Sequence, residues 1–202
     1  MKLYFSPGAC SLAVHIALRE THANFDLEKV DLAKHETERG EDYMRINPKG
    51  YVPALRLEDG DVLTEVGVIL QYLADRKPEF GLAPRAGTME RYRLMESLNF
   101  ISSEIHKAFG PFWKPDVPQQ TKDAAQAQLA RRFDYVEARL GEKSWLMGDK
   151  FTVADIYLFV IANWTHFHKI DISKWPKLKD YMARIAARPR VQEAMRAEGL
   201  TK

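Results

Sequence analysis

The sequence has little cysteine, little net charge and no long apolar run. Cys10 is the only cysteine in 202 residues, so no disulfide can form within the chain, and a reducing compartment is expected. The 30 basic and 28 acidic side chains leave a formal net charge of +2, too balanced for a chain whose main partner is nucleic acid or an anionic membrane. No apolar stretch approaches the roughly 20 residues that cross a bilayer, and no secretory signal opens the sequence. These absences predict a cytoplasmic protein with no nucleic-acid or membrane partner.

The first part of the chain has the short, mixed apolar patterns of an α/β domain. Residues 2–5 predict a strand, and Ser6, Pro7 and Gly8 then break it before an apolar helix. Residues 25–32 predict a second strand, and residues 34–47 a polar, partly helical connection. A helix between the first two strands favours a right-handed parallel crossover.

A hairpin and a helix complete this part. Residues 52–57 and 62–65 flank Asp59-Gly60, and Asp-Gly favours a tight type I′ turn. The helix expected over 65–76 follows directly. The order β-α-β-(α)-β-β-α predicts a mixed four-stranded sheet with a helix layer, as in thioredoxin-like folds.

Proline and glycine mark a boundary after this domain. Residues 77–88 hold two of each, so we predict domains at 1–77 and 88–202 with a linker over 78–87. The second domain is predicted to be an all-helical bundle, because apolar residues recur at helical spacing. One such stripe, within a helix expected over 88–109, consists of Leu94, Leu98, Ile101, Ile105 and Ala108.

A central helix is predicted for residues 152–167, which are apolar on most sides. Thr152 and Asp155 have the spacing of a capping box, in which each side chain satisfies a main-chain N–H at the helix start. We assign this pair to folding rather than catalysis. Pro189 stands where a short last helix can begin.

Cys10 lies where the first helix starts. Unpaired N–H groups and the helix dipole at that position favour a thiolate, either that of Cys10 or one held beside it. A packed, unreactive cysteine is the alternative. A thiol with a pKa near 8.5 needs about 2.7 kcal/mol of stabilisation to be about three-quarters ionised at neutral pH, and a dipole supplies only ~0.3–1 kcal/mol. Direct hydrogen bonds must add the rest, and Ser11 with nearby main-chain N–H groups is the local candidate.

Several other kinds of chemistry are excluded. The chain has no second cysteine for an internal dithiol cycle. His166 and His168 project about 200° apart on a helix, which does not build a metal site, and the glycines form neither a phosphate loop nor a dinucleotide fingerprint.

Five short motifs carry a family resemblance. They stand in order along the chain: GACS (8–11), NPKGYVPAL (47–55), LTE (63–65), SSEIHK (102–107) and FTVAD (151–155). With them the chain resembles, from end to end, a bacterial beta-class glutathione S-transferase. The resemblance implies a homodimer that binds glutathione as co-substrate in a cleft between a thioredoxin-like and an all-helical domain, with no permanently bound cofactor and no metal.

The resemblance also implies roles in the first domain. Val52 precedes Pro53, expected to be a cis-proline, and would offer main-chain groups to the cysteinyl part of glutathione. Glu65 would accept from the γ-glutamyl ammonium, and the N–H of Val66 would bind the γ-glutamyl carboxylate; without the family, a dipole-favoured glutamate is the simpler interpretation of Glu65. The chain departs from the family pattern at two positions. Val66 replaces the usual serine or glycine. His35 replaces a lysine that is frequent at the glycyl carboxylate, and this second change predicts weaker binding of glutathione.

The second domain would supply the rest of the site. At about 100° per residue, Asn99, Ser103 and His106 fall within an arc of about 60° opposite the apolar stripe. With Glu104 and Ile105 they match the family's glutathione-contact region, although a lone histidine near a helix end is otherwise more often a C-terminal cap. The candidates for an apolar electrophile pocket, each equally consistent with the core, are Phe109, Phe112, Trp113 and Trp164.

These assignments predict an enzyme. It would stabilise the glutathione thiolate near Cys10 and Ser11, with His106 assisting, and add the sulfur to a small apolar electrophile. One alternative is thiol exchange or peroxide reduction through a mixed disulfide on Cys10. Another is a non-catalytic binding protein of the same fold.

Overall fold

The computed structural model describes residues 1–201. Its contacts divide the chain into two compact units. The sheet unit consists of Met1–Ala83 and the residues from Ala187 onward, and the helical unit consists of Pro84–Ala186. Within the described residues, no helix has both the length and the apolar content that crossing a membrane requires.

The unit boundary lies between Ala83 and Pro84, inside the predicted linker 78–87. The segment after Ala186 groups with the sheet unit, whereas the predicted second domain runs to residue 202. The predicted domain limits therefore stay a prediction. The contacts group the segment that follows Ala186 with the first unit, whereas the prediction placed it in the second domain.

One mixed sheet with the strand order β3-β2-β1-β4-β5 forms the sheet unit. Its strands are β1 (Lys2–Phe5), β2 (Asp26–Asp31), β3 (Glu36–Thr37), β4 (Ala54–Arg56) and β5 (Val62–Thr64). β1 pairs in parallel with β2 and antiparallel with β4, and β4 pairs antiparallel with β5. The predicted parallel crossover and the final antiparallel pair are confirmed.

The sheet has five strands rather than the predicted four. The additional strand, β3, lies in the connection that we predicted to be polar and partly helical. It pairs Glu36 with Asp31 and Thr37 with Val30, and two residues are too few to show the alternation by which a strand is predicted. The helical part is a 3₁₀ turn over Tyr43–Arg45.

The β4–β5 connection is longer than the predicted two-residue turn. Arg56 pairs with Val62, which leaves five residues, 57–61, in the loop. Gly60 has a φ of +95°, whereas Asp59 is not among the residues with positive φ. A type I′ turn requires positive φ at both central residues, so this part of the prediction is wrong.

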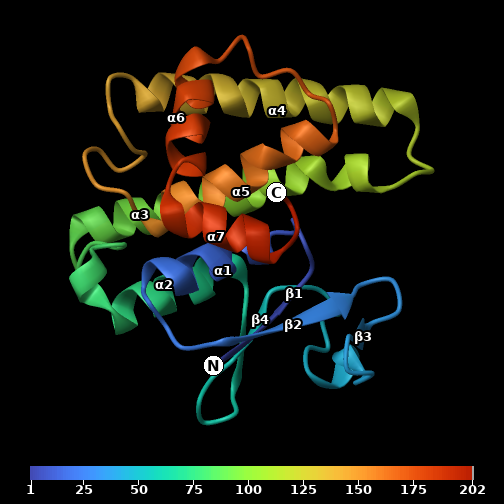
Figure 1. Ribbon diagram of the computed structural model, residues 1–202. Helices are drawn as coiled ribbons and strands as arrows, with labels where there is room; N and C mark the ends of the chain where they lie inside the picture. The colour runs from blue at the N-terminus through green and yellow to red at the C-terminus, as the bar shows by residue number, and fades with distance from the viewer. Residues whose placement is uncertain (202) are drawn as a thin grey trace. The chain divides into compact units, whose positions relative to one another are not determined.

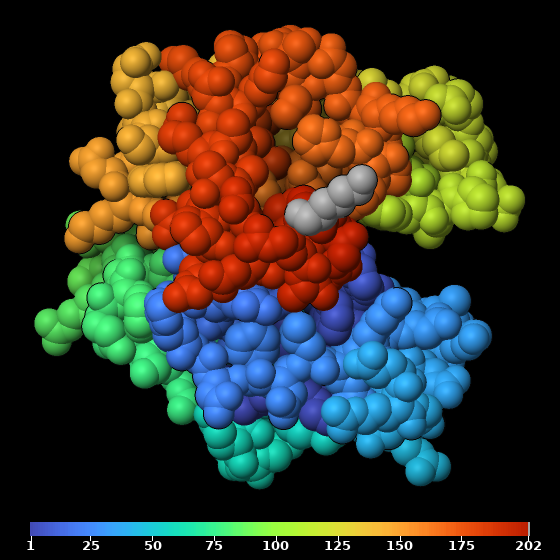
Figure 2. Space-filling model, viewed as in Figure 1, coloured from blue at the N-terminus to red at the C-terminus, as the bar shows by residue number. Residues whose placement is uncertain are grey.

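Three helices complete the sheet unit (Figure 1): α1 (Ser11–Glu20), α2 (Val66–Arg76) and α7 (Pro189–Ala197). A short 3₁₀ turn, Pro78–Phe80, follows α2. α1 packs against both α2 and α7, and its first eight residues are all buried. Figure 2 shows the red α7 segment lying directly on the blue α1 segment.

The helical unit consists of four α-helices and two variant helical segments. These are α3 (Met89–Phe100), the π-helix η3 (Ile101–His106), the 3₁₀ helix η4 (Lys107–Trp113), α4 (Gln119–Leu140), α5 (Val153–Phe167) and α6 (Pro176–Ala186). All five residues of the predicted stripe from Leu94 to Ala108 are buried, as expected for a core-facing surface.

The predicted single helix over 88–109 changes winding twice. η3 follows α3 directly and is wound more widely, with i→i+5 hydrogen bonds. The tighter η4 then contains Pro111, which has no N–H to donate to a helical ladder. The assumed rotation of 100° per residue therefore does not apply between Ile101 and His106.

α5 is the buried centre of the helical unit, and Asp155 anchors its start. Asp155 is fully buried, and its carboxylate accepts from the N–H and hydroxyl of Thr152 at 2.7 and 2.9 Å. It also accepts from the Leu146 N–H at 2.8 Å and the Tyr181 hydroxyl at 2.9 Å. Burial raises the pKa of Asp155, while these hydrogen bonds act to lower it. The predicted capping box is confirmed.

We expect Asp155→Ala to lower the free energy of unfolding by about 3 kcal/mol, because four buried donors lose their acceptor. Urea denaturation measures this change. Asp180→Ala removes an exposed carboxylate from α6 and should change stability by less than about 0.5 kcal/mol. Equal effects of the two substitutions would contradict the assigned role of Asp155.

Candidate active site

The loop that precedes α1 is a tight turn built on a glycine. Gly8 is buried with a φ of +72°, a conformation that strains any residue with a Cβ. The Ala9 N–H donates to the Ser6 carbonyl at 3.0 Å, and the Leu12 N–H to the Ala9 carbonyl at 3.0 Å. Cys10 then forms the N-cap of α1, as its sequence position predicted.

The Cys10 thiol lies against the segment that leads into β4. Its Sγ donates to the Val52 carbonyl oxygen at 3.3 Å, and Cys10 is partly exposed. The Val52–Pro53 peptide bond is cis, which confirms the conformation that the resemblance implied. The structure therefore brings together Cys10, Val52 and Pro53.

Two buried donors hold the residue that precedes Val52. The carbonyl oxygen of Tyr51 accepts from the Tyr43 hydroxyl at 3.1 Å and from the Asn47 side-chain amide at 2.6 Å. Burial raises the pKa of Tyr43 to about 12, so its hydroxyl keeps its proton at neutral pH. These contacts fix the main chain against which the thiol lies.

Ser11 makes different contacts from those predicted. Its hydroxyl is fully buried, donates to the Ser6 carbonyl at 3.3 Å and accepts from the Ser6 N–H at 3.2 Å. A hydroxyl has a single proton, and here it is directed to the loop. A role of Ser11 at a thiolate stays a prediction that these contacts do not support.

Glu65 stands at the start of α2. It is the N-cap residue with a φ of +70°, and its carboxylate is exposed and paired with the Lys49 ammonium at 2.6 Å. Lys49 also donates to the Thr64 hydroxyl at 3.0 Å. Val66 is the first helical residue and is buried. Glu65 thus already holds an ammonium group, the chemistry that the resemblance assigns to it.

His35 is exposed in the loop before β3 and has a φ of +53°. Its main-chain carbonyl accepts from the Tyr43 N–H at 2.8 Å. A Cβ on Gly50 would approach the His35 ring to 3.0 Å and the Met44 sulfur to 3.2 Å. Gly50 also has a φ of +76°, so glycine is required where the NPKG turn passes His35.

A buried network ties the loop before Cys10 to the C-terminal segment. The Glu198 carboxylate accepts from the Gly8 N–H at 2.9 Å and lies 2.9 Å from His15 Nδ1. Arg19 Nε donates to His15 Nε2 at 2.9 Å. Because Nε2 accepts, the His15 proton must be on Nδ1, which donates it to Glu198. His15 and Glu198 have no exposed side-chain surface.

The helical unit contains the remaining predicted glutathione contacts. Asn99 and Ser103 are exposed, and the Ser103 hydroxyl donates to the Asn99 carbonyl at 2.9 Å. Glu104 forms an ion pair with Arg132 at 2.6 Å. Ile105 is fully buried, so its side chain belongs to the core and only its main chain could contact a ligand.

His106 ends the π-helix within an aromatic cluster. Its Nδ1 lies 2.8 Å from the hydroxyl of Tyr157, and its ring packs edge-on against Trp164 with centroids 4.9 Å apart. A hydrogen bond between a ring nitrogen and a side chain of α5 differs from the C-terminal cap that a lone histidine at a helix end would suggest.

The four predicted pocket residues are neighbours. Ring centroids lie 6.1 Å apart between Phe109 and Phe112, and 5.5 and 5.2 Å from Trp164 to Phe109 and Trp113. Phe109 is fully buried and belongs to the core, whereas Trp113 is 51% exposed. His168 packs on this cluster, and burial lowers its pKa.

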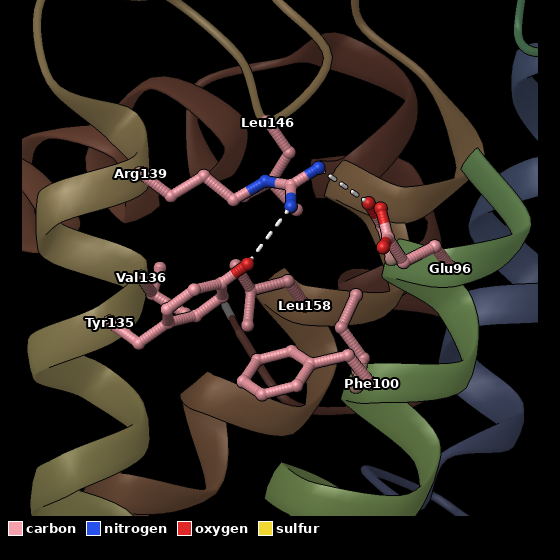
Figure 3. Close-up of a pocket in the computed structure, with 9 residues that line it drawn as sticks. Glu96, Phe100, Tyr135, Val136, Arg139, Leu146 and Leu158 are labelled. Atoms are coloured by element: carbon pink, nitrogen blue, oxygen red, sulfur yellow. Dashed lines mark hydrogen bonds between the residues drawn. The ribbon is translucent and has the colours of Figure 1, made fainter. Parts of the chain in front are cut away.

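A separate cavity of about 180 Å³ lies between α3, α4 and α5 of the helical unit (Figure 3). Arg139 reaches across it and donates to the Tyr135 hydroxyl at 3.1 Å and the Ser97 hydroxyl at 2.9 Å. Phe100 and Leu158 form part of its apolar wall. None of the predicted site residues lines this cavity.

Three residues that take part in these contacts were not singled out from the sequence. Tyr157 lies seven residues before Trp164, hence on the same face of α5, and this spacing could have linked it to the aromatic cluster. Lys49 lies within the NPKG motif. Glu198 gives no local signal, because its contacts are with residues about 190 positions away.

Known proteins match this chain over nearly its full length. The glutathione S-transferase N-terminal domain matches residues 7–76, and the C-terminal domain matches residues 100–189. Glutathione S-transferase GstA of Escherichia coli O157:H7 is 46% identical over 200 residues, which cover 99% of this chain and 100% of that protein.

Two solved structures show the same fold. The bacterial beta-class enzyme of Sphingomonas chungbukensis is 51% identical with a TM-score of 0.97, and a sphingomonad glutathione S-transferase complexed with glutathione is 48% identical with a TM-score of 0.96. Each match covers 100% of both chains. The chain belongs to the glutathione S-transferase family. Within that family it is a bacterial beta-class enzyme.

We expect Glu198→Gln to lower the free energy of unfolding by about 2 kcal/mol, because an amide NH₂ would face one of the two buried donors. Urea denaturation gives the value. Glu58→Gln removes an exposed carboxylate that is paired at the surface with Arg76 and should change the free energy of unfolding little. If Glu198→Gln proved no more destabilising than this control, the network would not hold the loop.

Proposed function

We propose that this glutathione transferase binds the glutathione thiolate beside Cys10 and adds it to small apolar electrophiles. The observation that carries the proposal is the Cys10 thiol at the start of α1, donating to the carbonyl of Val52 next to a cis-proline. A sulfur bound there would lie near the main-chain groups of Val52 and the N-terminal end of α1. Both the dipole and the unpaired N–H groups at that end favour an anion.

Several weak interactions must act together on that anion. The helix dipole supplies ~0.3–1 kcal/mol, and a hydrogen bond to a charged group contributes about 1.5–3 kcal/mol. One dipole and one charged hydrogen bond together reach the roughly 2.7 kcal/mol that shifts a thiol to about three-quarters ionised at neutral pH. Cys10 is therefore proposed as a donor whose S–H turns from the Val52 carbonyl to the reacting sulfur when glutathione binds, and glutathione as the nucleophile.

The charged groups at the two ends of glutathione would be bound by a side chain of opposite charge, by a main-chain N–H and by an imidazole. Glu65 would accept from the γ-glutamyl ammonium, as it now accepts from Lys49, and the N–H of Val66 would bind the γ-glutamyl carboxylate. His35 would donate to the glycyl carboxylate. Its neutral imidazole gives less charge attraction than a lysine would.

The helical unit is proposed to supply the remaining groups. Asn99, Ser103 and Glu104 would contact glutathione, and His106 would assist at its sulfur. Contacts from Ile105 are restricted to its main chain by burial. The exposed Trp113 would form the wall for an apolar electrophile. Trp164 packs against its ring, and Phe109 of the core packs against both Trp164 and Phe112.

The reaction also bears on where the enzyme works. Conjugation consumes the free thiol of glutathione, and reducing compartments such as the cytosol keep thiols free. We therefore place this enzyme in the cytoplasm.

Conjugation of glutathione to an aryl halide tests the function. We expect the wild-type enzyme to be active and Cys10→Ala to keep about a tenth of its kcat, since the reacting sulfur belongs to glutathione and only one charged hydrogen bond is lost. Cys10→Ser retains a donor and should lose less activity. An inactive wild-type enzyme would overturn the proposal.

The same variants separate the alternative reaction, thiol exchange through Cys10. Mass spectrometry after treatment with glutathione disulfide would show a glutathione adduct on Cys10 if that sulfur reacts. An adduct together with loss of all conjugation in both Cys10 variants would make Cys10 the reacting group instead of a neighbour.

A second copy of this chain is the partner that we propose for one face of the helical unit. Large apolar side chains are exposed along α3, at Met89, Tyr92 and Met95, and α4 adds Tyr135. The ring of Tyr135 packs on Phe100 with centroids 4.9 Å apart, and both residues line the 180 Å³ cavity shown in Figure 3. Exposed apolar surface continuous with an apolar cavity is typical of a protein–protein interface.

Met95→Glu should convert the dimer to a monomer, because it would bury an unpaired charge at the interface. Sedimentation velocity measures the mass in solution. Phe80→Glu places the same charge on an exposed aromatic position of the sheet unit and should leave the dimer intact. A wild-type monomer, or a dimeric Met95→Glu variant, would contradict this choice of interface.

A further inference from the structure

Tyr157 is a buried tyrosine whose hydroxyl is hydrogen-bonded to His106, the histidine proposed to assist at the glutathione sulfur. It lies on α5 with 1% of its surface exposed, and its hydroxyl oxygen is 2.8 Å from Nδ1 of His106. His106 is the last residue of the π-helix. The inference that follows rests on the proposed function, in which His106 assists at the glutathione sulfur.

The orientation of the His106 ring is fixed by α5. The Tyr157 ring packs edge-on against it, with centroids 6.0 Å apart and an interplanar angle of 88°. Trp164, about two helical turns further along the same face of α5, packs edge-on at 4.9 Å and 71°. A 180° flip of the ring would place Cδ2 where Nδ1 now lies and would break the Tyr157 hydrogen bond, so this contact holds Nδ1 toward Tyr157.

The chemistry of the two groups decides which of them donates. A phenol is a stronger acid than a neutral imidazole N–H, and an imidazole nitrogen is a better acceptor than a phenolic oxygen. The favoured pairing is therefore O–H···Nδ1, and a neutral ring whose Nδ1 accepts must carry its proton on Nε2.

We propose that Tyr157 is a positioning residue for His106: its hydroxyl donates to Nδ1 and holds the imidazole as the Nε2–H tautomer. In this form Nε2 is a hydrogen-bond donor and has no lone pair with which to accept a proton. His106 then stabilises a thiolate by donating to it and does not act as the base that removes the thiol proton.

Nitrogen-15 NMR of histidine-labelled protein tests the tautomer without reference to activity. The chain has six histidines, and His106→Gln identifies the His106 signals by their loss. Above the ordinary histidine pKa of about 6.5, we expect Nδ1 unprotonated and hydrogen-bonded, and Nε2 protonated. In Tyr157→Phe the Nδ1 signal should shift toward that of a nitrogen without this bond. A wild-type Nδ1 that carries the proton, or signals unchanged in Tyr157→Phe, would overturn the proposal.

Tyr181→Phe is the matched control, because it removes another fully buried tyrosine hydroxyl from the same unit, the one that donates to Asp155. It should leave the His106 signals in place even where it lowers stability. A control that moved these signals as far as Tyr157→Phe does would indicate a general structural change and count against the proposal.

Kinetics link the tautomer to the reaction. Loss of a partner that fixes a histidine tautomer costs about 10- to 100-fold in metal sites, and we expect Tyr157→Phe to lower kcat for conjugation by about 10-fold with the KM for glutathione changed by less than about 2-fold. An unchanged kcat would overturn the catalytic part of the proposal. If the wild-type enzyme did not conjugate at all, the NMR result would still decide the tautomer, so the two failures are distinguishable.

Discussion

The Glu198 carboxylate ties the C-terminal segment of the sheet unit to the active-site loop before Cys10. It accepts one hydrogen bond from the main chain of Gly8 and one from the imidazole of His15, both away from water. A buried carboxylate is stable only when such donors surround it, so loop, helix and C-terminal segment hold one another in place. The position of the Cys10 thiol, two residues after Gly8, depends on this mutual support.

A second set of contacts fixes the other side of the thiol. Tyr43 and Asn47, both buried, hold the carbonyl of Tyr51 and thereby the chain that leads into Val52. The thiol donates to a carbonyl whose position is determined one residue earlier. Two independent buried networks thus meet at Cys10, which is why a single, partly exposed cysteine can be placed accurately on a short loop.

The sequence was sufficient for the features that depend on local pattern. The order of strands and helices, the capping box at Thr152 and Asp155 and the buried stripe beginning at Leu94 all follow from periodicity or capping chemistry. The two-residue strand β3 and the five-residue loop at Gly60 were not predicted, since their geometry is determined by pairing across the sheet. The same reason applies to Glu198 and to the hydrogen bond of Tyr157 with His106, because the partners are far away in the sequence.

The change of winding between α3 and η4 alters which side chains share a face of the helix. A constant 100° per residue groups Asn99, Ser103 and His106 on one arc, whereas the π-helix ends by turning His106 onto Tyr157 and Trp164 of α5. π-Helical turns occur often at functional sites. Here the π-helical turn lets a continuous helical segment keep an apolar stripe in the core and still direct His106, the last residue of the π-helix, to a buried hydroxyl.

The long sequence separation of the Glu198 contacts also sets the order in which the protein can be completed during synthesis. About 190 residues separate Gly8 from Glu198, and the whole helical unit lies between them in the chain. On the ribosome the strands and α1 therefore emerge long before the segment that locks their loop. The hydrogen bond that holds the active-site loop can therefore form only after almost the whole chain has been made, and contacts of such high sequence separation are slow to form in folding.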